Sequence, residues 1–381
     1  MSVVDFDLLA PYGWTPDVAA EYLPLLGDSL IPARLLRMDR SECDVAVPIA
    51  TTRLPDRAEA VIVRARCPRS DSDITGLCTG DWVGLSNESG ELPTTRRMLN
   101  SAVVRKLLPR KTAIVRAAVS GHSDSRARAA DQMLAANVDT VLLCSPGDGD
   151  VDLGRIERML ALAWESGAQP IVVLTKADLA VDLSLDEVRA AAPGATVLAV
   201  SASTGLGMEV LTAVLDGTVA LLGPSGAGKS TLANALLGSE VFATNAVREG
   251  DKRGRHTTVH RELRPLPGGG TLIDTPGLRS IGLWDAAEGI GRTFSDIESL
   301  SADCRFADCS HDREPGCAVQ AAIESGALPE RRLTSYRKLT RENEWMAARS
   351  DTRLRAERER AWKQINKDQR RMYRQRTQFG R

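Results

Sequence analysis

Two patterns of hydrophobic and polar residues divide this chain. Short apolar runs separated by turn residues occupy roughly the first third, up to residue 116. From Asp139 onward, continuous apolar runs alternate with segments in which apolar residues recur every three or four positions. The first pattern is typical of short β-strands, and the second is typical of strands that alternate with amphipathic helices.

The N-terminal pattern predicts a small β-barrel. Turn residues such as Pro55-Asp56 separate the runs, and about five short strands with such spacing favour a closed sheet. An OB-fold and an SH3-like barrel both fit this periodicity. Before the barrel, residues 1–30 are weakly patterned, with one short helix expected over residues 18–23. The expected strands are residues 44–47, 60–63, 81–85, 102–104 and 113–115.

The second pattern predicts a parallel sheet with helices on both faces. Strands that alternate with helices pair in parallel, because each helix returns the chain to the same end of the sheet. The first such helix is expected to end at Gly167, and its apolar face is formed by Leu153, Ile156, Leu160 and Trp164. The expected strands are residues 140–144, 171–174, 197–200 and 218–222.

A glycine-rich turn follows the last of these strands and matches the P-loop pattern G-x-x-x-x-G-K-[ST]. A helical segment follows from Thr231 to Leu237, with Gly238 as its expected end. Glycines let backbone N–H groups face phosphate oxygens, and the helix N-terminus adds partial positive charge. In this pattern Lys229 reaches the β- and γ-phosphates, and Ser230 is a ligand of Mg²⁺. The expected phosphate-binding residues are Gly223, Pro224, Ser225, Gly226, Ala227, Gly228, Lys229, Ser230 and Thr231.

Two further strands are followed by segments suited to a guanine base. Thr175, Lys176 and Asp178 resemble the Asn-Lys-x-Asp motif of GTPases, with threonine in place of asparagine. The Asp178 carboxylate can accept from the N1–H and 2-amino donors of guanine, whereas adenine would leave it unpaired. Lys176 is expected to lie along the base and ribose. Ser201 and Ala202 follow the next strand, and the Ala202 N–H is expected at guanine O6.

The remaining nucleotide-binding segments lie after the P-loop. Asp274 and Gly277 belong to a D-x-x-G segment, in which the carboxylate holds Mg²⁺ through water and the Gly277 N–H contacts the γ-phosphate. Within the basic loop 253–258, Thr258 is the expected further Mg²⁺ ligand. Ordinary GTPases have the base-recognition segments after D-x-x-G, whereas here they precede the P-loop. The domain is therefore predicted to be circularly permuted, which compact domains tolerate because their termini often lie close together.

Three cysteines and one histidine follow the permuted domain within a short segment. Cys304, Cys309, His311 and Cys317 have the ligand types of a structural zinc site. Four protein ligands leave no open coordination position, so a catalytic metal is not expected here. The alternative is a set of buried thiols.

The composition favours a reducing cellular compartment and suggests a partner with many negative charges. The chain has 381 residues, seven cysteines and no apolar run long enough to span a membrane, so a disulfide framework and a membrane partner are not expected. No signal peptide is visible, which favours a reducing cytoplasm. Residues 330–381 contain 17 Lys and Arg against 7 Asp and Glu, which gives this segment a net charge of +10, whereas the rest of the chain has a net charge of −11. Such a tail is expected to bind nucleic acid, and a solvated charged helix is the alternative. Trp345 is expected to pack, and the expected contacts to RNA phosphates are Arg331, Arg332, Arg337, Lys338, Arg353, Arg355, Arg370 and Arg371.

Taken together, these segments resemble the ribosome-small-subunit-dependent GTPase A family. The resemblance rests on the permuted order and on residues 254–258, 304–311, 314–317, 80–83 and 134–139, and it covers roughly residues 30 to 345. It implies an OB-fold, a permuted GTPase domain and a zinc-binding helical domain, with GTP, Mg²⁺ and Zn²⁺ as cofactors. It also implies a role in late maturation of the small ribosomal subunit. Thr175 and the N-terminal 30 residues, which lack a strongly basic arm, depart from the family pattern.

The residue after D-x-x-G bears on catalysis. Most GTPases have a glutamine there that orients the attacking water, but here the position is Leu278, which has no hydrogen-bonding group. The resembled family has a histidine at the position of His256, and an imidazole can orient water through a ring nitrogen. We therefore expect His256, Lys229 and Thr258 to be the catalytic residues. A solvent-exposed loop histidine is the alternative.

These observations predict an α/β permuted P-loop GTPase preceded by an all-β OB-fold barrel and followed by a zinc-binding α-helical domain. The expected function is a monomeric cytoplasmic GTPase that binds small-subunit rRNA and couples hydrolysis to release from the particle. A GTP-dependent rRNA-binding scaffold without turnover is the main alternative. A transporter-type ATPase is disfavoured because no L-S-G-G-Q segment is present. The expected domains are residues 1–30, an N-terminal extension; 31–116, the barrel; 117–290, the GTPase domain; and 291–381, the zinc-binding domain with its basic tail.

Overall fold

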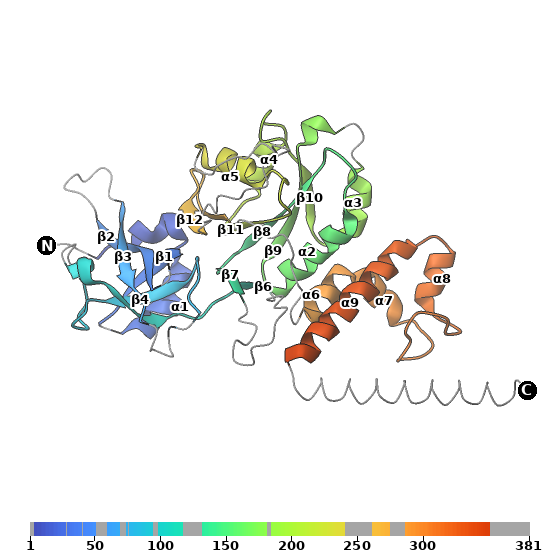
Figure 1. The fold of residues 1–381 in the computed structure, drawn as a ribbon, viewed down its shortest axis with the longest axis horizontal. Helices are drawn as coiled ribbons and strands as arrows, with labels where there is room; N and C mark the ends of the chain where they lie inside the picture. Colours follow the sequence, from blue (N-terminus) through green and yellow to red (C-terminus); the bar gives the residue numbers. More distant parts are fainter. Residues whose placement is uncertain are drawn as a thin grey trace, which may run out of the picture. The chain divides into compact units, whose positions relative to one another are not determined.

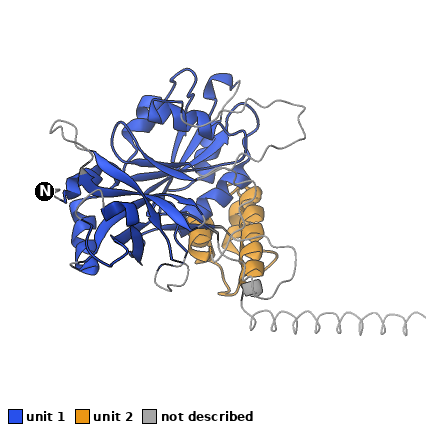
Figure 2. Cartoon of the chain, turned by 60° about the vertical axis from the view of Figure 1, so that its left-hand side comes forward, with its two compact units in different colours: residues 1–282 blue, residues 283–381 orange. Residues whose placement is uncertain are grey.

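The computed structural model of this chain divides into two compact units, residues 1–282 and 283–381 (Figure 2). Across the parts that the structure describes, none of the helices is both long and apolar enough to cross a bilayer. The structure describes residues 4–27, 29–39, 41–50, 59–68, 74, 76–93, 98–116, 132–180, 184–240, 261–274 and 286–350.

The first unit begins with a closed five-stranded barrel (Figure 1). Its strands close in the order β1-β2-β3-β5-β4, with the β3–β5 pair parallel and the other pairs antiparallel. A five-stranded barrel of this kind is OB-like, which decides between the two barrels that the periodicity allowed. The elements are the 3₁₀ helix η1 (Phe6–Tyr12), α1 (Pro16–Leu26), β1 (Ile31–Asp39), β2 (Glu42–Ala50), β3 (Ala60–Arg66), β4 (Trp82–Ser86), the 3₁₀ helix η4 (Met98–Ser101) and β5 (Val103–Leu107).

One of the five strands expected in the barrel lies elsewhere. The run at 113–115 forms β6 (Ala113–Arg116), which pairs with β7 (Gln132–Ala136) in a separate two-stranded sheet. Its place in the barrel belongs to β1, which the apolar pattern did not reveal because Arg34 and Arg37 interrupt it. Arg34 is nevertheless only 2% exposed, with its guanidinium over the Trp82 ring at 4.7 Å from the ring centroid. The sequence pattern therefore did not indicate β1, because it treats Arg34 as a polar position although this side chain is buried.

The predicted parallel sheet is confirmed, with an antiparallel edge strand. Its order is β10-β9-β8-β11-β13-β12, and every pair is parallel except β12–β13. The strands are β8 (Thr140–Pro146), β9 (Gln169–Thr175), β10 (Thr196–Ala199), β11 (Thr218–Leu222), β12 (Glu262–Pro265) and β13 (Thr271–Asp274).

Alternate residues of the sheet face two different hydrophobic cores. On β8, Val141 and Leu143 join a core with side chains of α2 and α3, whereas Leu142 joins a second core with side chains of α4 and α5. Helices thus cover both faces, as the strand–helix alternation predicts. The helices are α2 (Leu153–Glu165), α3 (Leu185–Ala191), α4 (Met208–Ala213) and α5 (Lys229–Leu237).

The barrel and the sheet share a core and a buried polar junction. Trp14 and Trp82 belong to the same hydrophobic cluster as Val141 in the sheet. The Arg34 guanidinium donates to Thr218 Oγ1 at 3.0 Å, at the start of the strand that leads into the P-loop. Burial lowers the pKa of Arg34 to about 10, although nearby carboxylates oppose this shift. Barrel and sheet therefore form one compact unit.

The second unit is a small helical module. Phe294, Ile297, Leu333 and Leu339 are among its buried apolar side chains. Its helices are α6 (Ala287–Thr293), α7 (Ser295–Ser301), α8 (Ala318–Glu324) and α9 (Glu330–Ser350).

Candidate functional sites

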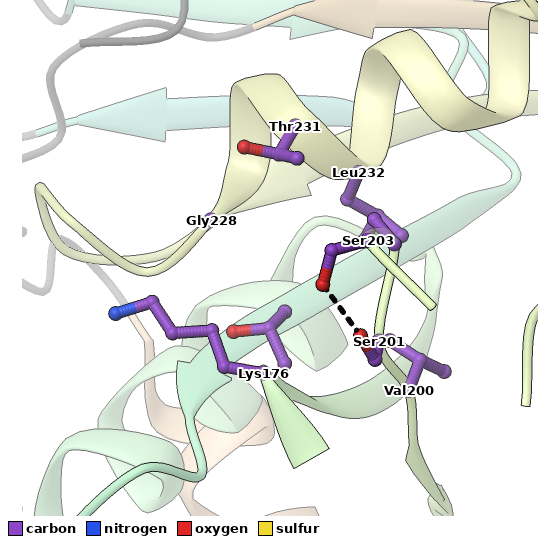
Figure 3. A pocket seen from close by; sticks show the side chains of 9 residues that line it. Lys176, Val200, Ser201, Ser203, Gly228, Thr231 and Leu232 are labelled. Carbon is purple, nitrogen blue, oxygen red and sulfur yellow. Dashed lines mark hydrogen bonds between the residues drawn. The ribbon is translucent and has the colours of Figure 1, made fainter. Parts of the chain in front are cut away.

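The expected nucleotide-binding segments converge at one edge of the sheet. Because β9, β10, β11 and β13 are parallel, the segments that follow them emerge at the same end. Ligands of open parallel sheets bind at this carboxyl end. Figure 3 shows the pocket there, which is lined by Thr175, Lys176, Val200, Ser201, Ala202, Ser203, Gly228, Thr231 and Leu232. The pocket thus combines residues from both base-recognition segments and the P-loop.

The P-loop turns tightly between β11 and α5. Gly226 and Gly228 have φ values of +83° and +70°, which L side chains rarely adopt. A Cβ at Gly223 would lie 2.4 Å from the Cys144 carbonyl oxygen, so only glycine fits there. The N-cap residue of α5 is Gly228, which has no side chain that could accept from the first N–H groups of the helix. These glycines are therefore required by the backbone, as the motif predicts.

Two opposite charges lie beside the P-loop, the half-buried Lys229 and the buried Asp274. Lys229 Nζ donates to the carbonyl oxygens of Gly223 at 2.9 Å and Pro224 at 2.7 Å, and burial lowers the pKa of its ammonium group. Asp274, at the end of β13, is 7% exposed. Burial raises the pKa of this carboxyl, and the charge of Lys229 acts in the opposite direction. Both side chains are thus partly desolvated, which strengthens their interaction with a charged ligand.

Thr175, which stands in place of the usual asparagine, contacts the P-loop. Its hydroxyl donates to the Ala227 carbonyl oxygen at 2.9 Å and lies 3.3 Å from the Ser145 carbonyl oxygen. The peptide bond between Ala227 and Gly228 is trans, so its N–H points away from its C=O. Holding the Ala227 carbonyl against Thr175 therefore directs the Gly228 N–H to the opposite side of the loop.

The two charged residues of the T-K-A-D segment lie in different surroundings. Lys176 has φ +55°, and its ammonium group pairs with Asp148 at 2.7 Å. Asp148 follows β8 and was not singled out from the sequence, because a lone aspartate in a loop carries no pattern. Asp178 lies on the 3₁₀ helix η5 (Ala177–Leu179) and is exposed. Lys176 is therefore held by a residue of the neighbouring strand's loop, whereas the Asp178 carboxylate faces solvent.

The second base-recognition segment is internally bonded. Ser201 is fully buried, its hydroxyl lies 2.9 Å from that of Ser203, and it accepts from the Thr204 N–H at 3.2 Å. The Ala177 N–H donates to the Val200 carbonyl at 3.0 Å, which joins this segment to the T-K-A-D turn. Ala202 and Ser203 line the pocket beside them.

The remaining predicted nucleotide-site residues are Ser230, His256, Thr258 and Gly277. Ser230 is the second residue of α5 and is partly exposed, next to Lys229. His256, Thr258 and Gly277 lie outside the described residues, so their roles stay predictions.

The four predicted metal ligands converge in the second unit. Their ligand atoms all lie within 4.8 Å of one another. His311 Nδ1 is 3.6 Å from Cys304 Sγ and 3.5 Å from Cys317 Sγ, and these two sulfurs are 3.9 Å apart. A tetrahedral zinc ion with Zn–S bonds of about 2.3 Å would separate two sulfurs by about 3.8 Å. Cys304, Cys309, His311 and Cys317 therefore fit a closed zinc site in both chemistry and spacing.

Polar side chains outside the ligand set hold the loop that carries His311. The Glu314 carboxylate accepts from the backbone N–H groups of Ser310, Asp312 and Arg313, and also from the Ser310 hydroxyl. These hydrogen bonds, led by that hydroxyl, lower the pKa of Glu314 to about 2. The ionised Glu314 carboxylate thus holds several backbone N–H groups of this loop together.

Two further polar residues, on α8 and α9, bond to the same loop. The His311 carbonyl oxygen accepts from Gln320 Nε2 and from the Arg337 guanidinium. The sequence did not reveal that Glu314, Gln320 and Arg337 hold this loop. A search for zinc ligands looks for cysteine and histidine, and these three residues are neither.

Parts of the predicted RNA-binding tail are structural instead. Arg332 is 1% exposed, pairs with Asp296 through two contacts of 2.7 and 3.0 Å, and stacks on Phe294. With Arg337 holding the metal-ligand loop, neither arginine is the free phosphate contact that the charge pattern suggested. Trp345, which was expected to pack, is 50% exposed. Residues 351–381 lie outside the described part.

Comparisons with known proteins agree with this geometry. Residues 107–284 match the family model "RsgA GTPase". The chain is 50% identical over 361 residues to the "Small ribosomal subunit biogenesis GTPase RsgA" of Streptomyces avermitilis, covering 93% of this chain and 91% of that protein. It is 42% identical over 371 residues to the protein of the same name from Opitutus terrae, covering 95% and 97%.

Solved structures show the same fold. A crystal structure of YjeQ from Thermotoga maritima superposes with a TM-score of 0.55 at 23% identity, covering 82% of this chain and 98% of that one. A crystal structure of YloQ, described as a circularly permuted GTPase, gives 0.53 at 22% identity, covering 84% and 96%. The permuted order of the nucleotide-binding segments and the extent of the sequence identity lead to one conclusion: the chain belongs to the RsgA GTPase family and is a GTP hydrolase.

Proposed function

We propose that this GTPase binds the small ribosomal subunit, acts in its late maturation and leaves the particle when GTP is hydrolysed. The relatives named for small ribosomal subunit biogenesis support this, since they match over more than nine-tenths of the chain. The observation that carries the proposal is the convergence of the base-recognition segments and the P-loop on one pocket. The proposed setting is the cytoplasm, and the proposed state is a monomer.

The nucleotide is proposed to lie along the carboxyl edge of the sheet. Its triphosphate would occupy the P-loop, from Gly223 to Thr231, with Lys229 at the β- and γ-phosphates. Guanine would meet the Asp178 carboxylate and the Ala202 N–H. Thr175 contributes indirectly, because its bond to Ala227 sets the orientation of the next N–H in the phosphate loop.

Magnesium completes the proposed phosphate site. Ser230 and Thr258 would hold the ion directly, and Asp274 would hold it through water. When bound, Mg²⁺ supplies charge that stabilises the transferring phosphoryl group. Burial of Asp274 makes its carboxylate a stronger electrostatic partner for such a cation.

We propose about one zinc ion per chain, held by Cys304, Cys309, His311 and Cys317. The spacing of their ligand atoms supports this assignment. Such an ion would stabilise a segment that has neither helix nor strand between Cys304 and Cys317.

The RNA-binding surface is proposed to include the exposed basic residues Arg331 and Lys338 on α9 and the basic residues beyond residue 350. Truncation near residue 330 would remove Leu333 and Leu339 from the core of the module, so it would not test RNA binding alone. Ending the chain after residue 350 preserves that core. This truncation should weaken subunit binding and reduce its salt dependence.

His256 is proposed to orient the attacking water, because Leu278 has no group that could do so. The test is single-turnover GTP hydrolysis with saturating small subunits, with large subunits or with neither. The native chain should be stimulated by small subunits alone, and His256→Ala should lose that stimulation while keeping its GTP affinity. Parental hydrolysis by His256→Ala would remove this residue from the mechanism. A native chain with no turnover under any condition would favour the scaffold alternative.

A further inference from the structure

The two ring nitrogens of His311 face different partners. Nδ1 lies 3.6 and 3.5 Å from the sulfurs of Cys304 and Cys317, inside the candidate metal cluster. Nε2 lies on the other side of the ring, 3.0 Å from the hydroxyl oxygen of Ser301. Ser301 is the last residue of α7 and is no metal ligand type for this cluster. Its position relative to His311 therefore needs a separate explanation.

Hydrogen-bond accounting gives the direction of the Ser301–His311 contact. The Ser301 hydroxyl has one hydrogen, and it donates to the Ile297 carbonyl oxygen at 2.8 Å. Since that hydrogen is already used, the Ser301 oxygen can only accept from His311, so Nε2 must have the proton. A neutral imidazole protonated at Nε2 has its lone pair at Nδ1, which is the nitrogen that faces the sulfurs.

We propose that Ser301 is a positioning residue for the metal site, which selects the Nε2–H tautomer of His311 and fixes the ring so that Nδ1 is the ligand atom. This inference rests on the proposed zinc site and adds its outer shell. Hydrogen bonds from a ligating histidine to a second group orient the ring and raise the affinity for the metal. The backbone of His311 has φ +59°. Side chains of α8 and α9 donate hydrogen bonds to its carbonyl oxygen, so both the backbone and the ring of His311 are held in place.

The chain offers a matched control two residues earlier. Ser299 lies on the same helix, and its hydroxyl donates to the Ser295 carbonyl at 2.7 Å, four residues back, as Ser301 does to Ile297. Ser299 is exposed, and no bond from it to His311 is present among the described residues. Removing either hydroxyl costs the same helix bond, but only one change removes the partner of His311.

The experiment measures zinc affinity of the full-length protein by competition with a chromophoric chelator. Ser301→Ala should bind zinc about 10- to 100-fold more weakly than the native chain, Ser301→Thr should recover most of the loss, and Ser299→Ala should match the native chain. Histidine nitrogen NMR of the native zinc-loaded protein provides a second readout that needs no variant. It should show His311 with a protonated Nε2 and a metal-bound Nδ1.

The outcomes separate this inference from the zinc site itself. A native chain that holds no zinc would remove the proposed site. A native chain that holds zinc, with equal affinity in Ser301→Ala and Ser299→Ala or with Nε2 as the ligating nitrogen, would overturn the role of Ser301 and leave the zinc site standing. If Ser301→Ala does not fold, the NMR assignment on the native chain decides.

Discussion

The nucleotide edge and the metal-ligand loop are built in opposite ways. The nucleotide edge joins segments from residue 175 to residue 274, and each is held at the end of a strand of the parallel sheet. Except for the edge strand β10, these strands are buried on both faces. The metal-ligand loop takes all four candidate ligands from residues 304–317, a segment without helix or strand. The first site depends on a large apolar core, whereas the second depends on polar contacts and, as we propose, on its metal.

This difference indicates which site should survive without its ligand. Burial of strand residues such as Val141, Leu142 and Leu221 stabilises the sheet whether or not nucleotide is bound. In the loop, the ligand atoms of three thiols and an imidazole lie within 4.8 Å of one another, and the Glu314 carboxylate accepts hydrogen bonds from the neighbouring backbone. Nucleotide should therefore be dispensable for folding of the first unit, and metal should be required for folding of the second.

Removal of the metal should have the largest effect. We expect Cys309→Ala, or treatment with a strong chelator, to unfold the second unit, seen as loss of helical circular dichroism and as protease cleavage after residue 283. The first unit should still bind GTP. Lys229→Ala is the reciprocal variant: it should lose GTP binding and retain about one zinc ion per chain. Retention of a protease-resistant second unit after complete zinc removal would contradict the proposed dependence.

The next largest effect should come from the guanine-recognition residue. Asp178→Asn should weaken GTP binding about 10- to 100-fold, because the amide oxygen can accept only one of the two hydrogen bonds and the other, to a charged group, is lost. The same variant should gain affinity for xanthosine triphosphate, whose 2-oxo group needs a donor. Asp186→Asn, which changes an exposed carboxylate on α3, is the control. Titration with both nucleotides checks this, and unchanged GTP affinity would remove Asp178 from the site.

A smaller effect is expected from the contact between Thr175 and the P-loop. Thr175→Val keeps the shape of the side chain but removes its bond to the Ala227 carbonyl. GTP and GDP affinity should each fall about 2- to 10-fold, as loss of one hydrogen bond implies, while the preference for GTP over inosine triphosphate stays the same. A changed base preference would instead place Thr175 at the base.

Thr271→Val is the matched control for that variant. Thr271 is fully buried at the opposite end of the sheet, on β13, and its hydroxyl has no hydrogen-bond partner among the described residues. Removing this hydroxyl should leave nucleotide affinity unchanged.

The smallest effect concerns the pH dependence of stability at the nucleotide edge. Burial raises the pKa of Asp274 in the folded state, so ionisation of this carboxyl reduces stability as pH rises through that value. Without nucleotide and Mg²⁺, Asp274→Asn should therefore have a higher melting temperature at pH 7, by on the order of 2 °C. The gap should close below about pH 4, where the unfolded chain is protonated as well. A variant that is less stable at pH 7 would contradict this account.

The sequence itself determined the parts whose chemistry is local. The glycines of the P-loop, the strand–helix alternation and the Cys₃His set are each readable within a few residues, and the structure or the comparisons confirm the architecture that they predict. The order of the motifs also showed the circular permutation, because order along the chain is a property of the sequence alone.

Only the tertiary structure decided the contacts between distant residues. Arg34 meets Thr218 across 184 positions, Thr175 meets Ala227 across 52, and Lys176 meets Asp148 across 28. The same holds for β1, whose arginine is buried on an aromatic ring, and for Arg332, whose charge is neutralised inside the module. Periodicity reports which face of an element is apolar, but it does not report which polar side chain another element brings opposite. That pairing exists only once the cores have packed, which is why the supporting residues of both sites became visible in the fold.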